Sequence, residues 1–188
     1  MTGPDLEPFE GFRLAMVLGQ DGATRGPDGT SKTLSNPNDR DLLMTLRRQA
    51  DVVITDAVTA TAEKYRASKL VPIEIWSRTG KWPAIFNEGE PGLYPISRVK
   101  SASVENEVLR LKGKRVLVEA GRTLTSKLAP HIGQLVLTVP RSVPEPLIAC
   151  NALAMAIGVG TLDNSMWITS VHQDDDNFYL VANRRGSN

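Results

Sequence analysis

One ten-residue stretch constrains the fold of this chain more than any other. It reads Arg115-Val-Leu-Val-Glu-Ala-Gly-Arg-Thr-Leu124. Its apolar run, 116–118, is typical of a strand buried on both faces. Gly121 then allows close backbone approach, and residues 123–126 fit the first turn of a helix that Pro130 cannot continue. The stretch predicts a strand, a glycine turn and a helix whose first N–H groups suit a phosphate, with an ordinary turn glycine as the alternative.

Length and charge limit the class of protein. The 188 residues suffice for one domain with a substantial core, so we expect a single domain over 1–188, with residues 1–10 as a flexible extension. The 22 basic and 21 acidic residues nearly balance, which indicates neither a nucleic-acid nor a membrane partner. One cysteine and two histidines leave no internal disulfide and no zinc cluster, so we expect no metal.

The N-terminus favours a cytoplasmic location. Asp5, Glu7 and Glu10 lie where a signal peptide would need basic and then apolar residues. No apolar run in the sequence approaches the length of a membrane span. We therefore expect a protein of the reducing cytoplasm.

Strands and helices alternate along the chain, which is typical of an α/β domain with a mostly parallel sheet. We expect strands at 12–18, 52–54, 72–76, 93–96, 116–118, 134–139, 167–172 and 178–182. The turn at 173–177 predicts that the last two strands form an antiparallel hairpin. Asn36 can cap a helix that begins at Pro37, and further helices are expected within 55–67, 104–112 and 147–157.

Several short segments occur in the order of a known family. They are Leu14–Gly22, Ser31–Ser35, Leu46–Ile54, Thr59 with Glu63 and Tyr65, and Val118–Leu124. With them the chain resembles the dihydrofolate-reductase-like family, and within it the reductase domain of bifunctional riboflavin-biosynthesis proteins, found also as stand-alone pyrimidine reductases. The resemblance implies a three-layer α/β domain with a mostly parallel central sheet and a C-terminal antiparallel hairpin. It also implies a homodimer that uses NADPH to reduce a phosphorylated ribosylamino-pyrimidine.

The resemblance implies site residues as well. Glu119 is expected to be catalytic, and substrate contacts are expected at Ser31, Arg47, Arg66 and Glu119. Ser77 and Arg78 follow a predicted strand, where such residues bind the 2′-phosphate that distinguishes NADPH from NADH. The expected cofactor contacts are Ala15, Thr33, Thr59, Glu63, Ser77, Arg78, Gly121, Arg122, Thr123, Leu124 and Thr125.

Three of these assignments have a structural alternative. Glu119 ends a buried strand, so its carboxylate belongs either to a polar site or to a salt bridge. Arg47 closes a predicted helix, where a cation suits the helix dipole. Arg66 is expected, with Lys69, to bind a substrate phosphate, while Arg78 has the alternative of a solvated loop residue.

The sequence also departs from the family pattern. Thr33 replaces a tryptophan that many relatives place beside the cofactor, and Asp56 replaces a small residue where its charge could repel a cofactor phosphate. These departures favour a second hypothesis, a non-catalytic relative that binds a nucleotide or a partner. A third is a dihydrofolate reductase, in which Asp39 or Asp41 would hold the pterin.

Overall fold

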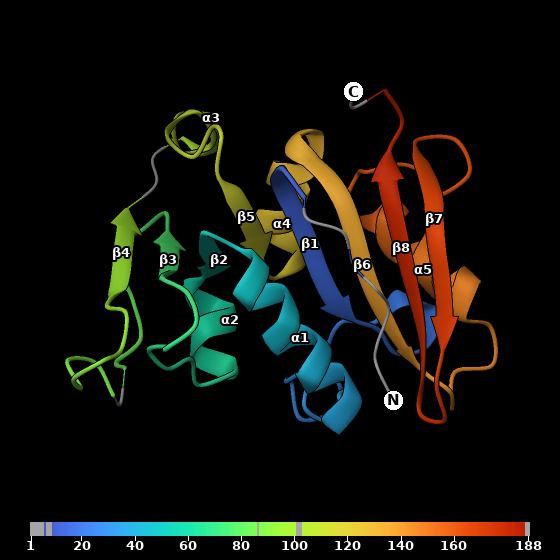
Figure 1. Cartoon of the computed structure of the whole chain (residues 1–188), viewed down its shortest axis with the longest axis horizontal. Helices are drawn as coiled ribbons and strands as arrows, with labels where there is room; N and C mark the ends of the chain where they lie inside the picture. Colours follow the sequence, from blue (N-terminus) through green and yellow to red (C-terminus); the bar gives the residue numbers. More distant parts are fainter. Residues whose placement is uncertain (1–5, 7–8, 86, 101–102, 187–188) are drawn as a thin grey trace.

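The computed structural model describes residues 6, 9–85, 87–100 and 103–186. The described chain forms an eight-stranded sheet in the order β4-β3-β2-β5-β1-β6-β8-β7, with β4 and β7 at opposite edges (Figure 1). The strands are β1 Gly11–Val17, β2 Val52–Asp56, β3 Ile73–Ser77, β4 Ile96–Lys100, β5 Arg115–Val118, β6 Ile132–Pro140, β7 Met166–Gln173 and β8 Asn177–Arg184. The first six strands in the sheet order, from β4 through β3, β2, β5 and β1 to β6, are parallel to their neighbours. Strand β8 runs antiparallel to both β6 and β7. The predicted mostly parallel sheet with a C-terminal hairpin is confirmed.

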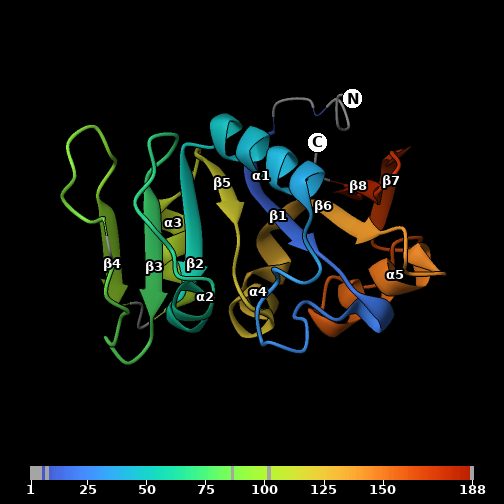
Figure 2. The same cartoon turned by 90° about the horizontal axis from the view of Figure 1, so that it is seen from below.

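Helices cover both faces of the sheet and give three layers. The helices are α1 Pro37–Gln49, α2 Ala57–Ala62, α3 Val104–Arg110, α4 Arg122–Leu128 and α5 Pro146–Ala156, with short 3-10 turns η1 Gln20–Gly22 and η2 Ala129–His131. Leu42 and Leu46 of α1 are buried with Ala60 of α2 in one core cluster. Leu128 and Leu153, from α4 and α5, belong to the cluster on the other face. Figure 2 shows α1 on one side of the sheet.

Local capping explains where two of the helices begin. The Asn36 side chain accepts a hydrogen bond from the Asp39 backbone N at 3.0 Å, and Pro37 occupies the first turn, as the sequence predicts. Helix α2 begins at Ala57, directly after its N-cap Asp56, whose carboxylate accepts hydrogen bonds from the backbone N of Val58 and of Thr59. Asp56 therefore lies at the carboxyl end of β2 and also caps α2.

Two elements differ in extent from their predicted positions. The strand expected at 93–96 begins only at Ile96, because Tyr94 forms an isolated bridge with Ser68 instead. The helix within 55–67 ends at Ala62, shortly before Lys64, whose φ of 52° no right-handed helix can contain.

The N-terminal segment is tied to the domain where it is described. Residues 1–5 and 7–8 of the expected flexible extension lie outside the described residues. Leu6 and Phe9 are buried in the core cluster that contains α1. The Gln49 side chain also donates to the Leu6 carbonyl at 3.0 Å. Leu6 and Phe9 belong to this cluster because their apolar side chains extend the core, while the flexible extension expected over residues 1–10 stays a prediction.

Candidate functional site

Two adjoining pockets open at the carboxyl edge of the parallel strands. The inner pocket, about 250 Å³ in volume, lies between β1, β6, α1 and the turn after β5; its lining includes Ala15, Ser31, Asp39, Thr59, Glu63 and Glu119. The outer groove, about 1260 Å³, lies along the ends of β2 and β3 and the start of α4; its lining includes Asp56, Ser77, Arg78, Arg122 and Lys127. Thr24, Arg25 and Gly121 line both, so the two form one cleft.

Strand register brings the two turns of this cleft together. Ile54 of β2 pairs with Val118 of β5. The chain therefore leaves the sheet at a similar level on both strands, which places Asp56 beside Gly121. Gly121 has an extended conformation with φ −66°, and a Cβ there would lie 3.0 Å from Thr59 Oγ1 and 3.2 Å from Asp56 Oδ2. The glycine thus permits a close approach of backbone to side chains, as the opening motif predicts.

The loop that joins the two pockets is held against α5. Gly22 has φ 71°, and a Cβ there would lie 2.8 Å from the Leu153 backbone N. Only glycine allows this approach, which fixes the start of the 19–35 loop and so positions Thr24 and Arg25 over the junction. The far end of the loop is held by Glu63, whose Oε1 accepts from the Ser31 backbone N at 2.7 Å.

Glu119 is at once part of the inner pocket and part of an ion pair. Arg47 donates from Nε to Oε1 at 2.8 Å and from Nη2 to Oε2 at 2.5 Å, and the Tyr65 hydroxyl donates to Oε2 at 2.6 Å. The Glu119 and Arg47 side chains are only 6% and 16% exposed. Burial by itself would lower the pKa of Arg47, but the effect of the nearby Glu119 carboxylate is larger and raises it. Burial and the same carboxylate both raise the pKa of Tyr65.

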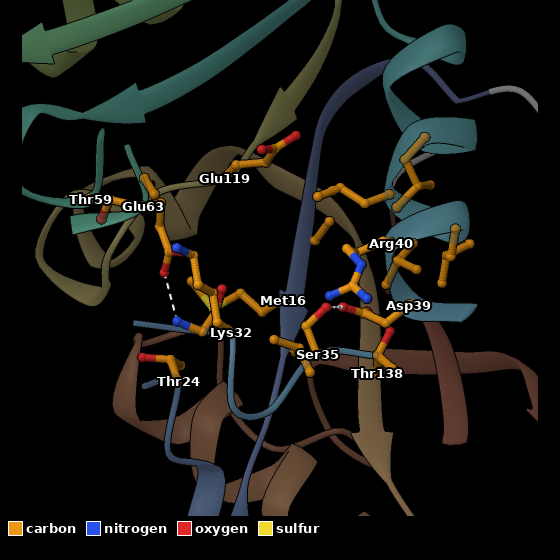
Figure 3. Close-up of a pocket in the computed structure, with 18 of the residues that line it drawn as sticks. Met16, Thr24, Lys32, Ser35, Asp39, Arg40, Thr59, Glu63, Glu119 and Thr138 are labelled. Carbon is orange, nitrogen blue, oxygen red and sulfur yellow. Dashed lines mark hydrogen bonds between the residues drawn. The ribbon is translucent and has the colours of Figure 1, made fainter. Parts of the chain in front are cut away.

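Asp39 places a third carboxyl group on the opposite side of the inner pocket. Figure 3 shows Glu63 and Glu119 on one side and Asp39 and Thr138 on the other. The Ser35 hydroxyl donates to Asp39 Oδ2 at 2.6 Å. Burial raises the pKa of Asp39, although its bonds to the Ser35 and Thr138 hydroxyls oppose the shift. Burial therefore shifts the Asp39 carboxyl group towards its protonated form.

The outer groove carries an excess of positive charge. Its lining holds five basic residues and one acidic residue: Arg25, Arg78, Lys81, Arg122 and Lys127, with Asp56. None of these five cations takes part in the ion pairs formed among the described residues. A groove lined by unpaired cations attracts an anionic ligand. The inner pocket is balanced, with three acidic and three basic residues in its lining.

The described residues contain neither a membrane-spanning helix nor a metal-binding cluster. No described helix is long and apolar enough to cross a bilayer. No group of three or more histidine, cysteine or acidic side chains among those residues is arranged to hold a metal ion.

Comparison with known proteins identifies the fold. A pyrimidine reductase-like protein from Corynebacterium diphtheriae superimposes with a TM-score of 0.70 at 14% identity, over 93% of this chain and 92% of the other. The bifunctional diaminohydroxyphosphoribosylaminopyrimidine deaminase and 5-amino-6-(5-phosphoribosylamino)uracil reductase from Thermotoga maritima gives 0.68 at 17% identity, over 92% of this chain and 56% of that longer one. Dihydrofolate reductase from Enterococcus faecalis gives 0.59 at 11% identity, over 93% and 96%.

The chain has the dihydrofolate-reductase-like fold. The resemblance found in the sequence is thereby confirmed for the fold. No family model and no curated protein sequence matches the chain, so the likeness rests on structure at low identity.

Within this dihydrofolate-reductase-like fold most of the expected site residues line the cleft. Ala15, Ser31, Thr59, Glu63 and Glu119 line the inner pocket, and Gly121 lines both pockets. The outer groove is lined by Ser77, Arg78, Arg122, Thr123 and Leu124. Ser77 is buried, and its hydroxyl accepts from the Lys81 backbone N at 3.2 Å.

Four expected contacts lie elsewhere. Thr33 is exposed and folds over Gly26, where a Cβ would lie 1.6 Å from its hydroxyl oxygen. Arg47 lies behind Glu119 and lines neither pocket, because it is the ion-pair partner of that residue. Arg66, like Lys69, is exposed outside both pockets, whereas Tyr65 beside it points inward. Thr125 is fully buried, with its hydroxyl bonded to the Ala120 carbonyl at 3.0 Å.

Other residues of the cleft were not expected from the sequence. Lys32 and Arg40 are exposed cations at the inner pocket, and Arg25 lines both pockets. Lys81 and Lys127 complete the basic groove. The only sequence signal for Arg25 and Lys32 was their place in a glycine-rich loop, which does not say which way a side chain points.

Proposed function

We propose that this protein is an NADPH-dependent reductase of a phosphorylated ribosylamino-pyrimidine in riboflavin biosynthesis, such as 5-amino-6-(5-phosphoribosylamino)uracil. The observation that carries the proposal is the continuous cleft, in which a groove of unpaired cations meets a smaller, charge-balanced pocket at Gly121. A long anionic cofactor suits the groove, and a small polar substrate suits the pocket. The likeness to pyrimidine reductases of the same fold supports the choice of substrate.

The residues of the outer groove fit NADPH at several points. Ser77 and Arg78 would bind the 2′-phosphate, since a serine and an arginine at the end of a strand can both donate to it. Arg122 and Lys127 add positive charge beside Gly121, towards the pyrophosphate. When bound, the cofactor supplies a hydride to the substrate in the inner pocket.

The residues that line the inner pocket have different roles in the proposed reaction. Glu119, fixed by Arg47 and Tyr65, presents a carboxylate that accepts hydrogen bonds from sugar hydroxyl groups. Lys32 and Arg40, in place of the expected Arg66, supply cations for the substrate phosphate. Met16, Leu42 and Val136 give the pocket apolar lining that excludes water from the reacting atoms.

Replacing Arg78 by alanine is expected to weaken NADPH binding by about 1.5–3 kcal/mol, the usual contribution of a charge-assisted hydrogen bond. NADH lacks the 2′-phosphate, so its affinity should change little. Isothermal titration of both cofactors against the wild type and Arg78→Ala measures the difference. Arg66→Ala is the matched control, because Arg66 is an exposed arginine outside the cleft. An equal loss for both cofactors would remove the 2′-phosphate assignment.

A second candidate function, reduction of a pterin, is favoured by Asp39. The sequence offered Asp39 or Asp41 for this role, and Asp39 lines the inner pocket whereas Asp41 is exposed and lines neither pocket. A carboxyl group there can form paired hydrogen bonds with a ring amine and ring nitrogen. Saturable binding of dihydrofolate that Asp39→Asn abolishes would favour this function over the first.

The raised pKa of Asp39 carries a prediction for stability. Ionising Asp39 costs more in the folded protein than in the unfolded chain, so its charge destabilises the fold above the folded-state pKa. Asp39→Asn should therefore melt higher than the wild type at neutral pH. The gain should vanish as the pH falls through the folded and then the unfolded pKa. Melting curves across the acid range measure it, and a gain that grows as the pH falls would contradict the assignment.

The proposal includes a homodimer in the cytoplasm. Strand β7 lies at an edge of the sheet and exposes Trp167 and Val171, which are 59% and 51% accessible. An exposed edge strand with apolar side chains is suited to pairing with a second chain. Light scattering should give twice the chain mass, and a monomer at working concentration would remove the dimer.

A further inference from the structure

The turn after β2 carries a negative charge into the junction of the two pockets. Asp56 is the acidic residue of the described outer-groove lining, among five basic residues. Its Oδ2 accepts from the Gly121 backbone N at 2.6 Å and from the Thr59 hydroxyl at 2.8 Å. Its Oδ1 accepts from the backbone N of Val58 and of Thr59 at 3.0 and 2.9 Å. Four donors at one junction thus point at a carboxylate of the chain itself.

These contacts bear on any ligand that crosses the junction. A phosphate at Gly121 would find its backbone N–H already bonded to Asp56 and a like charge beside it. Like charges placed together at an interface weaken binding, and they discriminate against the wrong partner. The cations of the groove, with Arg25 at this same junction, attract phosphates, while the Asp56 carboxylate that accepts the Gly121 N–H repels them there.

We propose that Asp56 is a specificity-determining residue that lowers the affinity of the cleft for a ligand carrying phosphate at the junction with the inner pocket. The inference rests on the proposed function, since NADPH carries its pyrophosphate between the 2′-phosphate and the nicotinamide. The chain therefore binds NADPH more weakly than its basic groove alone would allow. A role as a structural strap between the two turns makes the opposite prediction, because loss of the strap would loosen the site.

The test is titration calorimetry with NADPH on the wild type and two variants. Asp56→Asn removes the charge and keeps the size, while Asp56→Ser is neutral and can still cap α2. Asp175→Asn makes the same charge change at an exposed residue outside both pockets and serves as the control. Melting curves establish that each variant is folded, and the serine variant decides the matter if the asparagine variant does not fold.

Both Asp56 variants are expected to bind NADPH at least about tenfold more tightly than the wild type, with the control unchanged. The ratio should shrink at high salt, because salt screens the repulsion. Binding by the variants that equals or falls below that of the wild type would overturn the inference and leave the proposed function standing. No binding by the wild type or by either variant would overturn both.

Discussion

Replacing Arg47 by alanine is expected to lower the free energy of unfolding by about 3–5 kcal/mol, because the change leaves the Glu119 carboxylate buried without its cation. The pair is bidentate, and the Glu119 side chain is only 6% exposed. The Tyr65 hydroxyl is the sole remaining side-chain donor to Glu119 among the described residues. Urea unfolding of the wild type and the variant measures the loss.

Arg48→Ala is the matched control for this experiment. Arg48 follows Arg47 in the last turn of α1 and is exposed, so it shares the helix-end position without the ion pair. Its replacement should cost no more than about 0.5 kcal/mol. Equal losses for the two variants would show that Arg47 acts on the helix dipole alone. The buried ion pair would then contribute nothing to the fold.

Gly121→Val is expected to abolish NADPH binding, because it adds bulk where the backbone must approach the phosphates of the cofactor. A Cβ at this position already lies 3.0 Å from Thr59 Oγ1 and 3.2 Å from Asp56 Oδ2, so the valine methyl groups must displace the β2 turn or fill the junction. The backbone conformation itself suits valine, since φ is −66°, so most of the fold should survive.

The control for this variant is Gly133→Val on β6. A Cβ at Gly133 meets only the Phe12 carbonyl oxygen, at 3.9 Å, and Gly133 lines neither pocket. Titration of both folded variants with NADPH separates steric closure of the cleft from a general effect of valine. Unchanged affinity in folded Gly121→Val would reduce Gly121 to an ordinary turn residue.

The sheet and the cleft edge were predictable because they depend on local patterns. Val116 to Val118 are a short apolar run typical of a buried strand, and Gly121 and Thr123 mark the turn and helix that follow. The Asn36 cap is equally local, since donor and acceptor are three residues apart. Patterns of this kind locate the ends of strands, and the ends of parallel strands locate the cleft.

Contacts between distant residues could not be predicted in the same way. Arg47 and Glu119 were each expected at the substrate, yet they are 72 residues apart in sequence and their pairing follows from how α1 packs over β5. Arg66 follows Tyr65, and only the folded backbone shows that the tyrosine faces Glu119 while the arginine faces solvent. Thr33 was placed at the cofactor by family position, but its local packing on Gly26 decides its place.

The most direct test of the central claim is a turnover assay with purified protein, 5-amino-6-(5-phosphoribosylamino)uracil, and either NADPH or NADH. Loss of the absorbance of the reduced nicotinamide follows the reaction. The account predicts oxidation that depends on the pyrimidine, is faster with NADPH than with NADH, and yields the ribitylamino product. A folded protein that binds NADPH saturably but oxidises none of it with this substrate would contradict the account and favour a non-catalytic, nucleotide-binding relative of the same fold.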